Sequence, residues 1–152
     1  MARFNFRLQQ YLGVKEQMET QKELEYAKAL RKVEEEKQLL RELHANREAQ
    51  IADFQQKVLN NIDTIEIKLL NDSIERLKQY IKKQEERVKA AEEFAEIKRQ
   101  ELVEAMKERK ALEIVRDNAR EAFNLEQNLV EQKQVDELVS FKYKNAQAQR
   151  SG

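Results

Sequence analysis

The longest regular pattern in this sequence is a repeat of apolar residues between Leu70 and Val130. Alternating steps of four and three residues connect eighteen positions, thirteen of them apolar, and most residues in between are Glu, Lys, Arg or Gln. The positions are Leu70, Ile74, Leu77, Ile81, Gln84, Val88, Ala91, Ala95, Lys98, Leu102, Ala105, Arg109, Leu112, Arg116, Ala119, Phe123, Glu126 and Val130. This spacing predicts a long helix whose narrow apolar stripe packs against another helix, as in a coiled coil.

A second, more polar stripe of the same kind begins at Tyr26. It comprises Tyr26, Leu30, Val33, Lys37, Leu40, His44, Arg47, Ile51, Phe54, Val58 and Asn61, of which seven are apolar. Upstream, Leu8 and Leu12 are one helical turn apart, so we expect the first helix to start near Asn5 and to continue through Gly13 at a cost of about 1 kcal/mol relative to Ala. The first predicted helix therefore covers residues 5–60.

A cluster of short polar residues interrupts the repeat after residue 59. Asp63 with Glu66, and Asp72 with Glu75, both have the spacing of a residue that caps a helix start and an acid in its first turn. Two helix starts within about ten residues indicate that the chain turns there. We therefore predict a turn at residues 61–72, a second helix at 73–144 and a flexible tail at 145–152, all within a single hairpin, 1–152.

Folding the chain about residues 61–72 gives an antiparallel pairing in which the two residue numbers add to about 133. This register places Leu30 opposite Leu102, Tyr26 opposite Met106, Phe54 opposite residues 77–81, and Phe4 opposite residue 129. It also places Arg47 near Glu86 and Lys37 near Glu96, and such charge pairs favour the hairpin over a parallel dimer, because a buried base without a partner costs several kcal/mol. The chain beyond about Val130 would then have no intramolecular cover.

The composition supports an all-α fold and gives no sign of catalysis. The 152 residues include no Pro, Cys or Trp and only two Gly, 38% are charged, and the net charge is zero. We therefore expect no disulfide, no nucleic-acid binding and, without an apolar run of ~18 residues, no membrane insertion. His44 is the only His and has no Cys companion, so we predict no metal site, no cofactor and no catalytic residue.

The uncovered C-terminal end has the residues of a docking surface. It carries Val135, Leu138, Val139, Phe141 and Tyr143, and its last fourteen residues include Lys142, Lys144 and Arg150 but no acid. The aromatic residues Phe4 and Phe6 are expected at the same end of the hairpin. Apolar side chains that have nothing to pack on within the chain favour a protein partner.

Three blocks of the sequence resemble the bacterial flagellar export protein family FliJ. They are FNFRLQQYLGVKEQ at residues 4–17, MKERKALEIVRDNAREAF at 106–123 and EQKQVDELVSFKY at 131–143. The resemblance implies a long antiparallel coiled-coil hairpin similar to the stalk subunit of rotary ATPases. It also implies a non-enzymatic, cytoplasmic part of the flagellar type III export apparatus, associated peripherally with the inner face of the membrane at the flagellar base, and thus a role in motility.

The resemblance further implies three partners, namely the hexameric export ATPase, the transmembrane export-gate protein and the chaperones of export substrates. The expected ATPase-binding residues are Phe6, Arg7, Leu8, Leu12, Asp136, Glu137, Leu138 and Phe141. The match is poor near the turn, where we expect Leu77, Tyr80 and Ile81 to form the export-gate site.

Three other readings of the same sequence stay open. A structural coiled coil would form a stable homodimer and leave every ATPase unaffected. A helical arm for nucleic acid would bind RNA in a salt-sensitive way, which the balanced charge disfavours. A stalk subunit of a different rotary ATPase would share the fold and differ in its partner.

Overall fold

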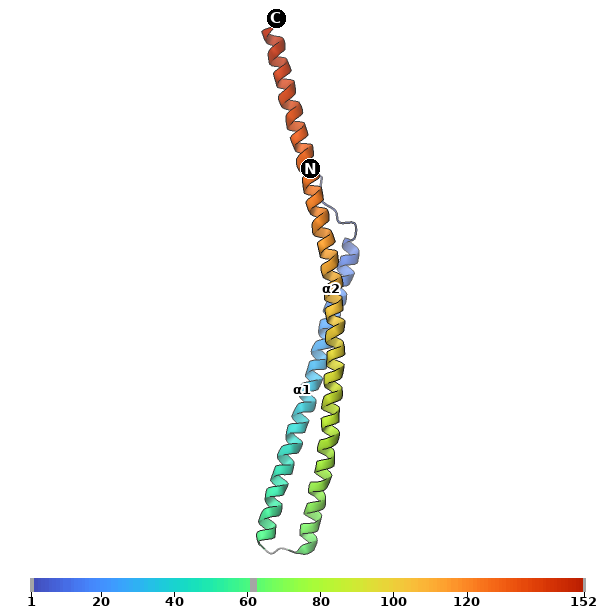
Figure 1. The fold of residues 1–152 in the computed structure, drawn as a ribbon, viewed down its shortest axis with the longest axis vertical. Helices are drawn as coiled ribbons and strands as arrows, with labels where there is room; N and C mark the ends of the chain where they lie inside the picture. Colours follow the sequence, from blue (N-terminus) through green and yellow to red (C-terminus); the bar gives the residue numbers. More distant parts are fainter. Residues whose placement is uncertain (1, 61–62, 152) are drawn as a thin grey trace. The chain divides into compact units, whose positions relative to one another are not determined.

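The computed structural model describes residues 2–60 and 63–151, and these form two long α-helices without a strand. Helix α1 (Gln9–Leu59) and helix α2 (Thr64–Arg150) run antiparallel and pack against each other (Figure 1). This confirms the predicted all-α hairpin. The packing divides into two compact units, one made of Met1–Gln17 with Met106–Gly152 and the other of Met18–Ala105, which we call the terminal unit and the central unit.

The stripe predicted for the second helix is the buried face of α2. All buried residues that the structure records on α2 belong to it, and they are Ile74, Leu77, Ile81, Gln84, Ala95 and Ala105. In the central unit, Ala95 packs with Ala29 and Val33 of α1, and Ala91 lies against this cluster. Two of the three buried residues in this cluster are Ala, so the cluster contains little apolar volume.

The stripe predicted for α1 is right at Val33 and wrong by one residue at the predicted positions on either side of it. Val33 is buried as expected, but Ala29 and Glu36 are buried in place of Leu30 and Lys37, and Leu30 is 47% exposed. His44, predicted on the seam, is also exposed. The sequence pattern favoured the larger apolar side chains, whereas the helix buries Ala29 and Glu36 because these face Ala95 and Gln84.

The connection between the helices is shorter than predicted. Asp63 caps α2, because its carboxylate accepts a hydrogen bond from the Ile65 N–H (3.3 Å) and its main-chain oxygen accepts one from Ile67 (3.1 Å). The second predicted cap, Asp72, lies inside α2, where the neighbouring Ser73 hydroxyl donates to Gln50 of α1 at 3.0 Å instead. The prediction that residues 61–72 form the turn is therefore wrong for residues 64–72, while residues 61 and 62 lie outside the described part of the chain.

The shorter connection changes the register of the hairpin. Several pairs that meet across the helices have numbers adding to 123, as in Gln50 with Ser73 and Lys22 with Glu101. Other pairs depart from this sum by a few residues, with 120 for Glu36 and Gln84 and 129 for Lys37 and Glu92. The predicted sum of 133 was wrong by ten because it assumed the later of the two caps.

The new register also changes the partners predicted for the polar seam residues. Lys37 pairs with Glu92 at 3.5 Å, not with Glu96, which pairs with Arg99 at 2.7 Å. The buried Nε of Arg47, predicted to pair with Glu86, has no hydrogen-bond partner among the described residues.

Both chain ends differ from the prediction. Helix α1 begins at Gln9, not near Asn5, and it passes through Gly13 as expected. Helix α2 continues to Arg150, so the expected flexible tail is helical over residues 145–150. The segment has no helix breaker before Gly152, which lies outside the described residues, and its Ala and Gln residues are good helix formers.

Candidate functional site

The terminal unit begins with an extended segment that packs along α2. Its side chains alternate, with Phe4 half-buried and Phe6 buried, while Asn5 and Arg7 point to solvent. This alternation is typical of extended backbone, in which successive side chains point to opposite sides. A hydrogen bond from the Gln9 N–H to the Phe6 carbonyl (3.1 Å) ends the segment where α1 begins.

Two aromatic rings hold this segment to α2. The ring centroids of Phe4 and Phe123 are 5.6 Å apart, and the guanidinium carbon of Arg120 lies 5.4 Å from the Phe4 centroid. One turn into α1, Leu12 is completely buried. These contacts are apolar and cation–π in kind, so they fix the N-terminal residues to α2 without using hydrogen-bonding groups.

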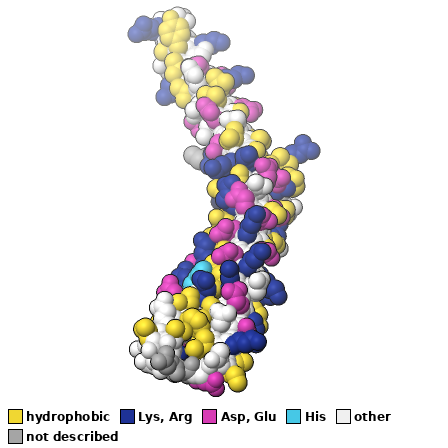
Figure 2. All heavy atoms as spheres, turned by 60° about the horizontal axis from the view of Figure 1, so that its bottom comes forward, with side chains coloured by type: hydrophobic (Ala, Val, Ile, Leu, Met, Phe, Trp, Pro, Cys, Tyr) yellow, Lys and Arg dark blue, Asp and Glu magenta, His cyan; other side chains and the backbone are white. Residues whose placement is uncertain are grey.

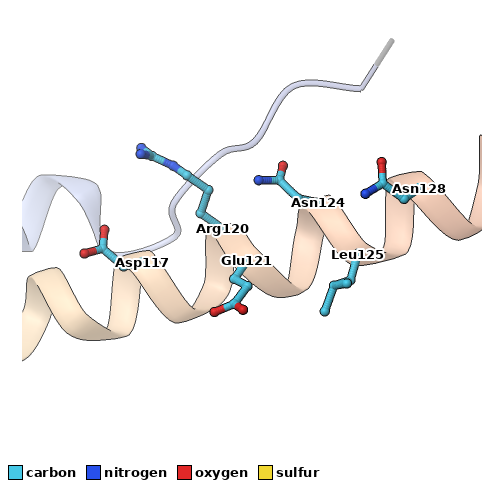
Figure 3. A pocket seen from close by; sticks show the side chains of 6 residues that line it. All are labelled: Asp117, Arg120, Glu121, Asn124, Leu125 and Asn128. Carbon is cyan, nitrogen blue, oxygen red and sulfur yellow. The ribbon is translucent and has the colours of Figure 1, made fainter.

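A shallow hollow of about 390 Å³ lies on α2 in this unit (Figure 3). It is lined by Asp117, Arg120, Glu121, Asn124, Leu125 and Asn128. Arg120 projects from α2 toward the N-terminal segment, and Asp117 accepts a hydrogen bond from Arg116 at 3.3 Å. Its lining mixes both charges, which gives it no preference for an anion or a cation.

Beyond this segment, α2 has no cover. Every residue from 128 to 150 is exposed, as predicted for the chain past about Val130. The large apolar side chains here, Leu129, Val130, Val135, Leu138, Val139, Phe141 and Tyr143, are between 44% and 67% exposed. Figure 2 shows hydrophobic side chains gathered at this end of α2 with Lys and Arg beside them.

Six of these apolar side chains occupy two opposite faces of the helix, and Val135 lies between the two faces. With about 100° between successive residues, Leu129, Val139 and Tyr143 lie within roughly 40° of one direction. Val130, Leu138 and Phe141 lie within roughly 40° of the opposite direction. We call residues 128–150 the uncovered end. A helix with apolar residues on opposite sides buries them all only when partners surround it.

The residues expected to bind an ATPase fall into two separate groups. Arg7 and Leu8 are exposed, but Phe6 and Leu12 are buried within the chain. Asp136, Glu137, Leu138 and Phe141 all lie on the uncovered end and are exposed. Because Phe4 packs against Phe123, the second group lies about 20 Å further along α2, at ~1.5 Å per residue.

The three residues predicted for an export-gate site do not form one exposed surface. Leu77 and Ile81 are part of the seam and 8% and 7% exposed, whereas Tyr80 is 55% exposed. In this structure only Tyr80 is available to a partner.

The salt bridges around Lys98, a residue of the predicted α2 stripe, were not predicted from the sequence. In the central unit, Lys22 and Lys98 form salt bridges with both Glu25 and Glu101, at 3.3–3.6 Å. The hydrogen bond from Lys22, followed by that from Lys98, lowers the pKa of Glu101, and the bond to Glu101 is the main cause of the raised pKa of Lys22. The sequence did contain a signal for this network, because the residue numbers of its oppositely charged pairs across the helices add to 123. The predicted register, with a sum of 133, did not bring these residues opposite each other.

A buried polar layer lies deeper in the same unit. The Gln84 amide donates to the Glu36 main-chain oxygen at 2.9 Å and also to the Glu36 carboxylate. Lys32 forms a salt bridge with that carboxylate at 2.9 Å, and together these bonds lower the pKa of Glu36. Buried polar pairs of this kind cost desolvation and specify one register of a coiled coil.

Within residues 2–60 and 63–151, no group of three or more His, Cys, Asp or Glu side chains could hold a metal ion. In the same ranges no helix combines the length and the apolar character that crossing a membrane requires.

Comparison with known proteins links the chain to one family. Residues 4–148 match the family model described as "Flagellar FliJ protein". The match includes the N-terminal segment, both helices and nearly all of the uncovered end. Neither the search of curated proteins nor the search of solved structures found a match.

Proposed function

Because the chain belongs to the flagellar FliJ family, and thus to the components of flagellar protein export, we propose that it is a non-catalytic adaptor that inserts its uncovered end into a hexameric export ATPase. Members of this family resemble the stalk subunit of rotary ATPases, and residues 4–148 cover almost the whole chain. We place the protein in the cytoplasm, at the inner face of the membrane where the export apparatus stands.

The observation that carries this proposal is the distribution of apolar residues on the uncovered end. Leu129 and Tyr143 face one side of α2, while Leu138 and Phe141 face the other, and all four are exposed. A flat partner surface would cover only one of these faces. The axis of a ring of subunits offers contacts all around the helix, so insertion buries both faces at once.

Such an insertion favours the assembled ring by mass action. A ligand that binds the closed hexamer, and not the separate subunits, stabilises the hexamer. The stabilisation grows with the logarithm of the ligand concentration divided by the Kd of the ligand for the hexamer. Asp136 and Glu137 lie between the apolar residues and are exposed, so they select ring subunits that present basic groups. In this mechanism the chain promotes assembly and does not itself carry out a reaction.

The N-terminal residues have a supporting role in the proposal. Phe6 and Leu12 are buried in the terminal unit, so they hold the start of α1 against α2. Arg7 and Leu8 remain exposed and form a second contact for the ring, more than about 20 Å from the Asp136 group. The export gate and the substrate chaperones are further proposed partners, with Tyr80 as the accessible residue of the gate site.

The test uses the native mass and the steady-state ATP hydrolysis rate of the cognate flagellar export ATPase. We expect the full chain to increase the hexamer fraction and the rate, and a chain truncated after Gln134 to do neither. The double variant Leu138→Asp with Phe141→Asp addresses the surface without shortening the helix. The control is Leu24→Asp, because Leu24 is exposed to the same degree as Leu138 but lies on α1 in the central unit.

The alternative readings give different results in the same experiments. A homodimeric scaffold would show twice the chain mass alone and would leave hydrolysis unchanged. A stalk of another rotary ATPase would activate that enzyme and not the flagellar one. Unchanged mass and rate of the flagellar ATPase with the full chain would overturn the proposal.

A further inference from the structure

Helix α2 carries a second heptad stripe beside the one that packs on α1. Its members are Tyr80, Lys83, Arg87, Ala90, Phe94 and Ile97, which follow alternating steps of three and four residues. Each stands one residue before a position of the buried seam, from Ile81 to Lys98, so the stripe lies about 100° around the helix. All six residues are exposed and belong to the central unit. We call them the second stripe.

The C-terminal half of the second stripe is apolar and exposed. Phe94 and Ile97 are each 53% exposed, and Ala90 adjoins them one turn earlier. The Lys98 ammonium lies 5.3 Å from the centroid of Phe94. Apolar residues at i, i+4 and i+7 are the pattern by which one helix packs on another.

The other half of the second stripe is basic and hollowed. Tyr80, Lys83 and Arg87 line a hollow of about 300 Å³ together with Leu43 and Gln84. Among residues 2–60 and 63–151, neither Lys83 nor Arg87 forms a salt bridge. Arg87 contributes to the lowered pKa of Glu36, but Lys32 is the residue that forms the salt bridge with that carboxylate.

From this juxtaposition we propose that the second stripe binds one amphipathic helix of a partner protein, with apolar residues at heptad spacing and carboxylates at one end. The apolar residues pack on Ala90, Phe94 and Ile97. The carboxylates enter the basic hollow, where Lys83 and Arg87 neutralise them and the Tyr80 hydroxyl donates a hydrogen bond. The charge at one end of the stripe fixes the direction of the bound helix.

A second copy of this chain is a poorer occupant. If two second stripes packed antiparallel about Ala90, Lys83 and Arg87 would face Ile97 and Phe94 of the other copy. If they packed parallel, the basic residues would face each other. Either arrangement leaves buried cations without an acid, which costs several kcal/mol. The stripe lies outside the uncovered end and acts independently of insertion into the ATPase.

The test uses two synthetic helical peptides of three heptads as probes. In both peptides, two heptads carry leucine at their two apolar positions. The third heptad is rich in glutamate in one peptide, called the glutamate peptide, and rich in lysine in the other, called the lysine peptide. Fluorescence anisotropy at low and high salt measures their binding to the full chain. We expect the glutamate peptide to bind, with an affinity that falls as salt rises, and the lysine peptide to bind at least about tenfold more weakly.

Paired substitutions assign the binding to the second stripe. Phe94→Ala with Ile97→Ala is expected to weaken binding of the glutamate peptide about tenfold or more. Lys83→Glu with Arg87→Glu is expected to do the same and to reverse the preference in favour of the lysine peptide. The matched control is Lys82→Glu with Lys89→Glu, two exposed lysines on another side of α2, and we expect a change below about twofold.

Each other outcome overturns the proposal. These outcomes are no binding at millimolar peptide, equal binding of both peptides, or equal losses in the test and control pairs. A dimer of the chain that Phe94→Ala with Ile97→Ala dissociates in light scattering would assign the stripe to a second copy instead. Circular dichroism of each variant verifies that the helices are intact.

Discussion

Replacing Leu12 with alanine tests what holds the start of α1 to α2. Leu12 is the one large side chain that is fully buried among the described residues. Substitution of a buried Leu by Ala costs about 2–5 kcal/mol, through lost transfer free energy and the cavity that remains. The interface here consists of only two helices and relaxes more easily than a globular core, so we expect about 2.5 kcal/mol.

This loss is expected to appear locally rather than over the whole chain. The terminal unit contains residues 1–17 and 106–152, so opening of its α1 segment leaves the contacts of the central unit in place. A change of about 2.5 kcal/mol corresponds to a roughly sixtyfold larger open fraction. Hydrogen exchange of amides in residues 12–17, which lie in the second and later turns of α1, should accelerate by that factor, while exchange around Ala29 and Ala95 should not change.

The control is Leu24→Ala, because Leu24 lies on the same helix and is 60% exposed. We expect it to change exchange in either unit by less than about threefold, since surface substitutions usually stay within ±0.5 kcal/mol. Equal effects of Leu12→Ala and Leu24→Ala, or acceleration in both units after Leu12→Ala, would show that Leu12 does not hold the terminal unit together.

Three further predictions concern stability. Gly13→Ala is expected to raise the free energy of unfolding by about 0.5–1 kcal/mol in thermal melts, because Gly13 is helical and no atom lies within 4 Å of the added methyl group; a loss of stability would contradict this. Asp63→Ala is expected to lower it by about 1 kcal/mol in urea titrations, whereas Asp63→Asn retains most of the cap. The folded-state pKa values of Glu36 and Glu101 are lowered, so the unfolded chain binds more protons in acid, and stability is expected to fall as the pH drops below about 4.3. Chemical denaturation between pH 7 and pH 3 measures this loss, which Glu36→Gln should reduce.

The amino-acid sequence determined the secondary structure and the buried face of α2. The chain has no Pro and a single Gly before its last residue, so nothing interrupts a helix within either half. The repeat from Leu70 to Phe123 follows helical geometry over many turns, and a pattern of that length is insensitive to an error at any one position. Ile74, Leu77 and Ile81 are accordingly buried as predicted.

The phase of the α1 seam depended on residues from the other helix. Leu30 and Ala29 are both acceptable seam residues by local pattern, and Leu30 is the more apolar. Tertiary packing chose Ala29 because it meets Ala95 closely, and it chose Glu36 because Gln84 satisfies its main-chain oxygen and its carboxylate. The residue pattern of α1 alone cannot predict the burial of Ala29 or Glu36, because the contacts that bury them come from α2.

The position of the turn, and with it the site, was also decided in three dimensions. Asp63 and Asp72 are equivalent capping signals in the sequence, and only the contacts across the hairpin distinguish them, as when Ser73 donates to Gln50. That choice set the register to 123, and Phe4 packs on Phe123, six residues before the position predicted for it. Local sequence determined that the helices form and which residues are apolar, whereas pairing between distant residues determined which of those residues are covered and which remain exposed for a partner.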